Sequence, residues 1–276
     1  MKAIYDRVSA ACCKITTQAY TSSFALGIKL LHKEYHSPIY AIYSFFRLGD
    51  EIVDTFHDYP KAALLTQFQT DTYQAIQDKI SLNPILNAFQ QVVHTFQIDL
   101  ALVQAFFESM EMDLNQKTHD QASFEKYLLG SSEVVGLMCL KVFCKKEEYT
   151  RLKPYAMRLG QAFQKVNFLR DLRADAQQLG RYYFPGGSFE QFNDTAKRAL
   201  EADIAADFEA ALVGIKQLPD SARLGVYAAY TYYRRLLHKI GKTSAQKLLK
   251  TRVRIPNYRK YAMMGGVWLR YKLNRI

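Results

Sequence analysis

Residues 161–185 read QAFQKVNFLRDLRADAQQLGRYYFP, and a helical period runs through them as far as Gly180. Four polar side chains recur every three or four residues: Gln164, Asn167, Asp171 and Asp175. This spacing places them on one face of a helix, with apolar neighbours such as Phe163 and Phe168 on either side. The stretch therefore predicts the second half of a long, partly buried helix with an acidic row.

A second carboxylate pair has the same spacing. Asp50 and Asp54 lie four residues apart, with Arg47 one turn before Asp50. One such pair alone is typical of an ordinary surface helix. Two matched pairs favour a different interpretation, in which two helices face each other across a cleft and hold divalent cations. Carboxylate ligands suit Mg²⁺, which binds a few protein oxygens together with water and substrate phosphates, so a diphosphate is the expected bridging ligand.

Further residues extend these motifs over nearly the whole chain: Ser22-Ser23-Phe24, Tyr43, Phe46, Arg47, Tyr127, Val135-Gly136, Arg170, Arg181, Tyr183 and Pro185. In this order and spacing the chain resembles the phytoene/squalene synthase family of head-to-head prenyl transferases. The resemblance implies an all-α fold, with residues 1–276 forming a single class I isoprenoid synthase domain, a helical bundle around a central cavity. The chain departs from the family pattern at Glu133-Val134, where relatives tend to carry a small residue.

The resemblance also implies roles for individual residues. The expected catalytic residues are the aspartates Asp50, Asp54, Asp171 and Asp175, which with Asn167 would hold the metal. The expected substrate-binding residues are Ser23, Arg47, Tyr127, Gln164, Arg170 and Arg252. The expected cavity wall is Phe24, Ile28, Tyr43 and Phe46. The cofactor is expected to be Mg²⁺, with Mn²⁺ as the alternative.

The implied reaction is a Mg²⁺-dependent condensation of two geranylgeranyl diphosphates to phytoene, through a cyclopropylcarbinyl diphosphate. No NAD(P)H is expected for that product. The alternative product is dehydrosqualene or squalene, made from farnesyl diphosphate. A class I terpene cyclase and a non-catalytic assembly protein of the same fold are the remaining alternatives. The intact aspartates disfavour the assembly protein, and the paired motifs resemble the head-to-head enzymes more than the cyclases.

The net charge of +11 is concentrated at the C-terminal end. Residues 221–276 contain 14 Lys and Arg and no Asp or Glu, whereas residues 1–220 carry 23 basic and 26 acidic residues. No nucleic-acid-binding motif accompanies this charge, so no nucleic-acid partner is expected. The basic region fits an anionic substrate or an anionic membrane surface. A solvated face without a role is the alternative.

Helical signals follow one another along the chain. Residues 2–18 carry apolar side chains at the helical positions Ile4, Val8, Ala11, Cys12 and Ile15. Helices are further expected over 22–31, from Ser37-Pro38 through Asp54, after Pro60, after Asn83, over 99–114, 123–143, 154–179, 188–218 and 220–240, and after Thr243 and Pro256. No convincing strand pattern or internal repeat is present.

The remaining signals concern location. No stretch approaches 18 consecutive apolar residues, which excludes a membrane-spanning helix on length. The first residues do not form a secretory signal, because charged Asp6 and Arg7 follow with no apolar core. The four cysteines have no metal-ligand or disulfide spacing, and Cys12 and Cys13 are expected to be small buried residues. The protein is therefore expected in the cytoplasm, peripheral at the inner membrane surface.

Overall fold

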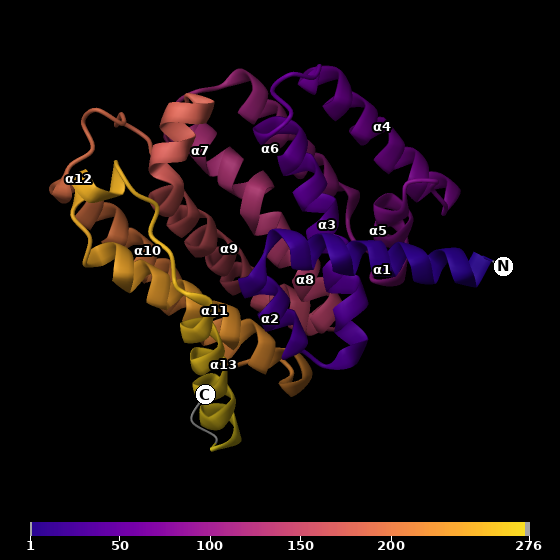
Figure 1. The fold of residues 1–276 in the computed structure, drawn as a ribbon. Coiled ribbons are helices and arrows are strands. Elements are labelled where there is room, and N and C mark those ends of the chain that lie inside the picture. Colours follow the sequence, from indigo (N-terminus) through magenta and orange to yellow (C-terminus); the bar gives the residue numbers. More distant parts are fainter. Residues whose placement is uncertain (1, 274–276) are drawn as a thin grey trace.

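The computed structural model describes residues 2–273, so residue 1 and residues 274–276 of the predicted 1–276 domain lie outside the described part. The described chain is helical almost throughout (Figure 1). In order, its elements are α1 (Lys2–Tyr20), α2 (Ser22–Lys29), α3 (Lys33–Asp54), α4 (Lys61–Asp78), α5 (Pro84–Thr95), α6 (Leu100–Asn115), α7 (Gln121–Leu128), the π-turn Leu129–Glu133, α8 (Val134–Phe143), α9 (Lys146–Ala174), the π-turn Asp175–Leu179, α10 (Asp194–Ile215), α11 (Asp220–Gly241), α12 (Ala245–Leu248) and α13 (Asn257–Lys272). Extended pairing within residues 2–273 is limited to one isolated bridge, Thr118 with Tyr182. The all-α prediction is confirmed.

Several helix ends follow the sequence signals. Asn83 caps α5, its side chain accepting the backbone N–H of Ile85 at 3.0 Å, and Pro84 opens the helix. Gly180 ends the long acidic helix in the left-handed conformation, with φ of 66°. Pro256 precedes α13 as expected.

Two prolines were predicted to open helices but lie inside them. Helix α3 begins at Lys33, five residues before Pro38, and α9 begins at Lys146, eight residues before Pro154. A proline within a helix removes one backbone N–H and one hydrogen bond. Near the start of a long helix this loss is tolerated, and α9 gains a start signal of its own because Lys145 N–H donates to Glu148 Oε2 at 3.3 Å.

Other boundaries also differ from the prediction. Thr21, rather than Ser22 or Ser23, caps α2 by accepting the N–H of Phe24. Helix α10 starts only at Asp194, because Asn193 accepts the N–H groups of its first turn. The region predicted as one helix over 123–143 is divided into α7, a π-turn and α8, and the long helix to Leu179 also ends in a π-turn. Both π-turns adjoin the site described below, a common location for such turns.

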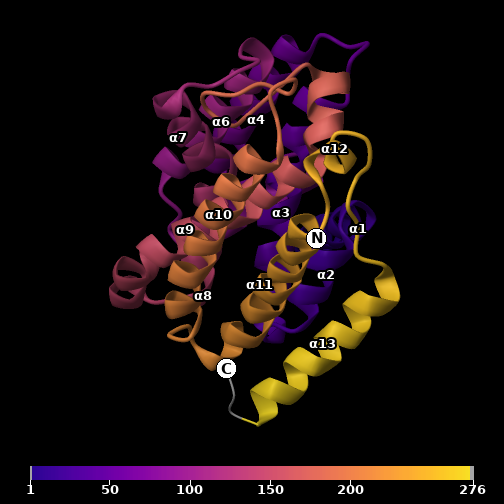
Figure 2. The same cartoon turned by 90° about the vertical axis from the view of Figure 1, so that its left-hand side faces the viewer.

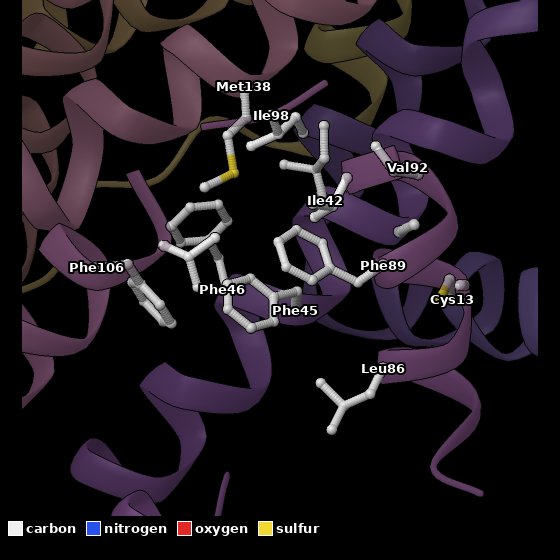
Figure 3. Packing of buried hydrophobic residues seen from close by; sticks show 14 of the residues in the cluster. Cys13, Ile42, Phe45, Phe46, Leu86, Phe89, Val92, Ile98, Phe106 and Met138 are labelled. Atoms are coloured by element: carbon white, nitrogen blue, oxygen red, sulfur yellow. The ribbon is translucent and has the colours of Figure 1, made fainter. Parts of the chain in front are cut away.

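The core of the first half of the chain centres on the aromatic ring of Phe45 from α3 (Figure 3). This ring stacks on Phe89 of α5 with centroids 3.8 Å apart, and lies against Phe106 of α6 at 5.1 Å. Through the face that carries Phe45, helix α3 thus packs closely against α5 and α6. This packing fixes the position of the other faces of α3, including the one with Asp50.

A second apolar cluster joins α9, α10 and α11, with Val166, Ile204, Phe208 and Leu236 fully or almost fully buried. Helix α13 lies outside this bundle and packs mainly on α11 (Figure 2). No helix within residues 2–273 has the length and apolar character needed to cross a bilayer.

Helix α1 departs from the usual arrangement of an amphipathic helix. Its buried residues are the small Ser9, Cys13 and Thr17, whereas Ile4 and Ile15 of its apolar row are more than half exposed. The periodicity predicted the helix correctly, but the large apolar side chains are on its outer surface.

Candidate active site

A cavity of about 520 Å³ runs through the centre of the helical bundle. Its walls come from α2, α3, the first π-turn, α8, α9, α10 and α11. One end carries charged and amide side chains: Arg47, Asp50, Gln164, Asn167, Arg170, Asp171 and Arg252. The remainder is mainly apolar and aromatic. The cavity is therefore suited to a molecule with an anionic head and a long hydrocarbon tail.

The first aspartate motif reaches the cavity from the last turns of α3. Asp50 lines the charged end, and Arg47 lies one turn earlier, paired with Glu51 and placed 4.4 Å from the ring centre of Tyr20. Burial raises the pKa of Asp50 to about 7, with the charge of Asp54 adding to the shift and Arg47 opposing it. Asp50 is thus a carboxylate whose negative charge is incompletely balanced by its neighbours.

The second motif approaches from the end of α9. Asp171 forms ion pairs with two arginines: Arg170 Nη2 lies 2.5 Å from Oδ2, and Arg252 Nε lies 2.5 Å from Oδ1. Arg252 comes from the segment after α12, so the basic C-terminal region contributes directly to this end of the cavity. Asn167 Oδ1 accepts a bond from Tyr233 Oη at 3.3 Å.

Asp175 begins the π-turn that ends the acidic helix. Burial raises its pKa to about 8, and the charges of Asp171 and Asp54 raise it further, while Arg181 opposes the shift. Asp50 of the first motif and Asp171 of the second line the same charged end of the cavity, so the two motifs face each other. Among residues 2–273, no three His, Cys, Asp or Glu side chains form a preformed metal cluster.

One buried carboxylate next to the first motif belongs to neither sequence motif. Asp113 of α6 lies behind the first motif and accepts hydrogen bonds from Tyr127 and Tyr183, each at 2.9 Å. Arg181 connects this group to the cavity end, with Nη1 at 3.2 Å from Asp113 and 2.7 Å from Asp54. Burial raises the pKa of Asp113 to about 7, although Arg181 opposes the shift. A signal existed in the sequence, because Asp113 continues the apolar row of Phe106 and Met110 at helical spacing.

The predicted substrate-binding residues are only partly brought together. Gln164 lies on the cavity wall, as do Arg47, Arg170 and Arg252. Tyr127 does not line the cavity and is instead buried against Asp113. Ser23 is also absent from the lining, and the neighbouring Ser22 accepts a bond from Lys260 Nζ at 2.6 Å.

All four predicted wall residues, Phe24, Ile28, Tyr43 and Phe46, line the cavity. Two further aromatic rings, which the sequence did not assign to the wall, also line the cavity. Phe163 and Tyr233 stack with centroids 4.1 Å apart, and Phe24 lies within 6 Å of both rings. Together they form an aromatic belt next to the charged end.

The residue that departs from the family pattern, Glu133, is the last residue of the first π-turn and is buried. Its carboxylate accepts a hydrogen bond from Gln161 of α9, and burial raises its pKa. Gly160 of α9 lies so close that an added Cβ would come within 2.6 Å of the Ser132 carbonyl oxygen. The π-turn and α9 therefore form one tightly packed wall of the cavity.

Comparison with known sequences agrees with this geometry. A profile of the squalene/phytoene synthase family matches residues 17–259. The chain is 28% identical to the 15-cis-phytoene synthase of Synechococcus elongatus, over 94% of this chain and 92% of that protein. It is also 28% identical to the chloroplastic phytoene synthase 1 of Solanum lycopersicum, over 86% of this chain and 61% of the plant protein, so it spans about three fifths of that relative.

Solved structures show the same fold. A dehydrosqualene synthase in complex with a ligand matches with a TM-score of 0.84 and 22% identity, over 97% of this chain and 98% of that one. A squalene synthase from Alicyclobacillus acidocaldarius matches with a TM-score of 0.75 and 18% identity, over 87% and 95% of the two chains. At these identities the likeness establishes the architecture, an all-helical isoprenoid synthase bundle.

Proposed function

Because the chain belongs to the squalene/phytoene synthase family, we propose that it joins two geranylgeranyl diphosphates head to head to form phytoene. The observation that carries this proposal is the single long cavity with acidic and arginine side chains at one end and apolar walls beyond. A prenyl diphosphate has the same division into an anionic head and a hydrocarbon tail. Family membership makes the chain a prenyltransferase, and the choice of a C20 substrate rests on the named relatives.

In the proposed reaction the first substrate breaks its C–O bond, losing diphosphate to leave an allyl cation. The double bond of the second substrate attacks this cation, and loss of a proton gives a cyclopropylcarbinyl diphosphate. A second loss of diphosphate, rearrangement and loss of a proton then give the joined hydrocarbon. No external oxidant or reductant is consumed on this route.

The arginines would bind the diphosphate group. Arg47, Arg170 and Arg252 surround the charged end, and a guanidinium group can hold two phosphate oxygens in one plane. Arg170 and Arg252 already meet at Asp171, so both can move to a substrate oxygen over a short distance. These contacts would orient the breaking C–O bond toward the aromatic belt.

The donor set fits Mg²⁺, with Mn²⁺ as the alternative. All candidate ligands are oxygens, and burial raises the pKa of Asp50 to about 7 and that of Asp175 to about 8, with neighbouring carboxylates adding to both shifts. Asp50, Asp54, Asp171 and Asp175 would hold the ion, with Asn167 next to them. When bound, the metal neutralises charge on the departing diphosphate.

The aromatic belt would protect the carbocation. Phe24, Phe163 and Tyr233 would present their rings close to the charged end, where a cation would form, and Tyr43 lies next to Phe24. The apolar wall beyond them excludes water, which would otherwise quench the cation. The protein would thus contribute to catalysis by positioning the substrates, balancing the charge of the diphosphate and excluding water from the cation.

The decisive experiment is incubation of the purified protein with Mg²⁺ and either geranylgeranyl or farnesyl diphosphate, with the products identified by mass spectrometry. Phytoene from the C20 substrate supports the proposal. Product from farnesyl diphosphate alone would replace phytoene with dehydrosqualene, or with squalene where a nicotinamide is required. No joined product from either substrate would reject the proposed activity.

A further inference from the structure

Arg181 connects the two aspartate motifs of the candidate site. Its backbone N–H donates to the carbonyl oxygen of Asp175 at 2.9 Å, across the π-turn that ends the acidic helix. Its side chain reaches the first motif, where Nη1 lies 2.7 Å from Asp54 Oδ1. One residue is therefore bonded to the last aspartate of each motif, although the motifs lie far apart in the sequence.

The guanidinium group of Arg181 also binds the end of helix α3. Nη2 donates to the carbonyl oxygen of Val53 at 3.2 Å, next to Asp54, the last residue of the helix. The last carbonyl oxygens of a helix have no partner within it and carry partial negative charge, which a nearby cation offsets. The same group thus holds both the backbone at the end of α3 and the carboxylate of Asp54.

Asp113 and Tyr183 hold the guanidinium group from the opposite side. Arg181 Nη1 lies 3.2 Å from Asp113 Oδ1 and 3.1 Å from Tyr183 Oη. Asp113 Oδ1 also accepts the Tyr183 hydroxyl, and Oδ2 accepts that of Tyr127, each at 2.9 Å. The side chains of Arg181 and Asp113 are only 6% and 4% exposed. Because a guanidinium group has its donors in one rigid plane, these bonds together fix its orientation.

The backbone on either side of Arg181 is fixed as well. Gly180 precedes it in the left-handed conformation, which turns the chain back after the π-turn. Tyr182 follows it and donates its N–H to the carbonyl oxygen of Lys117 at 2.9 Å, beside the bridge with Thr118. These contacts attach the segment to the loop after α6, the helix that carries Asp113. Both the backbone and the side chain of Arg181 are therefore bound to the helical framework.

The ion pair orients the carboxylate of Asp54. The side chain of Asp54 is 38% exposed, so packing alone does not determine its rotamer. Arg181 binds Oδ1, which leaves Oδ2 for another ligand. The direction in which Asp54 presents that oxygen is thus determined by Arg181.

A purely stabilising role explains this arrangement less well. Removing an arginine and a carboxylate from water costs free energy that their attraction returns only in part, and apolar side chains of similar volume often stabilise a protein as well. The pair between Arg181 and Asp113 is buried in this way. Its location, directly behind the last aspartate of the first motif and bonded to that of the second, connects it with the candidate site.

We propose that Arg181 is a positioning residue that sets the separation of the two aspartate motifs and the orientation of Asp54, and thereby the affinity of the site for a divalent cation. Asp113 and Tyr183 keep its guanidinium group in place. The inference rests on the proposed metal-dependent prenyl transfer, but it concerns binding of the ion, which can be measured without a prenyl substrate.

The test is titration of the metal-free protein with Mn²⁺, with the free ion followed by electron paramagnetic resonance and Mg²⁺ added as competitor. Arg181→Lys keeps the positive charge, but one ammonium group cannot replace a planar fork that contacts four acceptors. The matched control is Arg158→Lys. Arg158 Nη1 lies 2.9 Å from Oδ1 of the buried Asp207, and neither residue lines the cavity.

We expect Arg181→Lys to bind Mn²⁺ about 10- to 100-fold more weakly than wild type, the usual range when a residue that orients metal ligands is changed. Higher Mg²⁺ concentrations should restore much of its turnover, with the KM for prenyl diphosphate little changed. Arg158→Lys should bind Mn²⁺ like wild type. If Arg181 served only as a counter-charge or only for stability, Arg181→Lys would keep the wild-type affinity for Mn²⁺, and this result would overturn the proposal.

A milder pair of variants covers the case in which Arg181→Lys does not fold. Tyr183→Phe removes a hydroxyl that contacts both Arg181 and Asp113, whereas Tyr182→Phe removes one from the neighbouring buried residue. We expect Tyr183→Phe to weaken Mn²⁺ binding about fivefold, the effect of one hydrogen bond, and Tyr182→Phe to leave it unchanged. Equal affinities for these two variants would contradict the proposal.

The ion titration separates this proposal from the proposed function. A wild-type protein that binds Mn²⁺ more tightly than Arg181→Lys but joins no prenyl diphosphates would support the role of Arg181 and reject the prenyl transfer. Phytoene formation with equal Mn²⁺ affinities in wild type and Arg181→Lys would reject the role of Arg181 alone. A wild-type protein that binds no Mn²⁺ would reject the proposed role as well.

Discussion

At the scale of single residues, the candidate site is defined by unbalanced negative charge. Asp50, Asp113 and Asp175 all have raised pKa values, because each is buried and lies near other carboxylates. Arg181 is the cation that opposes the shift at Asp113 and Asp175, and Arg47 opposes it at Asp50. The arrangement is more acidic than its own arginines can neutralise, which is the expected condition of a site that binds cations.

The aspartates on the cavity wall should be required for turnover. Asp50→Asn or Asp171→Asn keeps the shape of the side chain and removes a negative charge, so we expect a folded protein with little activity on prenyl diphosphates. Asp78→Asn, on the exposed side of α4, is the matched control and should retain full activity. Rates and circular dichroism spectra of all three would be compared with wild type. A site variant that kept more than about a tenth of the rate, a barrier change of roughly 1.4 kcal/mol, would argue against the proposed metal site.

The raised pKa values also predict how stability depends on pH. A carboxyl group whose pKa is higher in the folded than in the unfolded protein binds more protons when folded, so its contribution is present below about pH 4 and is lost as pH rises through about 7 to 8. Between these values the metal-free protein should therefore become less stable with rising pH.

Denaturant unfolding of wild type and Asp113→Asn across this range measures the effect. The variant lacks one titrating group and should show a shallower decline, provided that both proteins unfold in two states. Parallel curves for the two proteins would show that Asp113 titrates at its ordinary pKa in the folded state.

At the scale of elements, the cavity wall is formed where helices cross closely. Helix α11 approaches α2 at Gly225, where an added Cβ would lie 2.4 Å from Leu31 Cδ2 and 2.8 Å from the Gly27 carbonyl oxygen. In contrast, nothing lies within 4 Å of a Cβ added at Gly265 of α13. The same substitution should therefore have opposite effects in the two helices.

Gly225→Ala should destabilise the protein by about 1 to 3 kcal/mol, because the backbone carbonyl cannot move aside without separating α2 from α11. Gly265→Ala should be neutral or stabilise by up to about 1 kcal/mol, through helix propensity. Thermal or denaturant unfolding of the two variants measures the change in the free energy of unfolding. A Gly225→Ala protein as stable as Gly265→Ala would show that α2 and α11 are free to separate.

We expect α2 to influence the chain length of the accepted substrate. Ile28 lies on the cavity wall, one turn beyond Phe24 and further from the charged end, and it is smaller than Phe or Trp. The cavity should therefore continue past it and admit a C20 chain. Ile28→Trp should lower the ratio of geranylgeranyl to farnesyl diphosphate turnover by ten- to a hundredfold, since overfilling a packed apolar space costs roughly 1 to 3 kcal/mol.

The volume-conserving Ile28→Leu variant is the control for this experiment and should keep the wild-type ratio. An unchanged ratio in a folded Ile28→Trp protein would remove Ile28 from chain-length selection. The proposal of phytoene as the product would then rest on the sequence relatives alone.

At the scale of the whole molecule, the fold was largely predictable from sequence, because helical periods and caps are local. The all-α class and most helix positions required only such signals, as at Asn83 and Gly180. The predicted starts of α3 and α9 were wrong because the sequence does not distinguish a proline in the first turn of a helix from one that lies one or two turns later. The first π-turn was not foreseen, since it contacts α6 and α9, which lie elsewhere in the sequence.

The site was predictable where it repeats a pattern and hidden where it depends on tertiary packing. Asp50, Asp171, Arg170 and Arg252 line the cavity together, whereas Asp54 and Asp175, the second aspartate of each motif, are not among its lining residues. Asp113 was not predicted because it is a single carboxylate on an apolar helix face and belongs to no repeated motif. Phe163 and Tyr233 were not predicted as wall residues for a similar reason. The chain contains many aromatic residues, and only their stacking in three dimensions distinguishes these two.

The uneven charge of the whole chain leads to a prediction about ionic strength. If the basic C-terminal region holds the protein to anionic vesicles, binding should weaken steeply as salt is added, because charges separated by more than about 10 Å are screened at 0.1 M. Vesicle flotation over a series of salt concentrations measures this dependence. Binding that does not respond to salt would leave only apolar contacts as the source of affinity.

The ion pair between Asp54 and Arg181 joins residues 127 positions apart. Closing so long a loop costs considerable entropy, so this contact forms only after the intervening helices have condensed. During synthesis, the first acidic motif therefore leaves the ribosome long before the cation that balances it. Pulsed hydrogen exchange during refolding should show the amides around Asp54 and Arg181 becoming protected in one late step. The reaction centre would then be the last part of the protein to acquire its final shape. A truncated or stalled chain would contain helices but no assembled reaction centre.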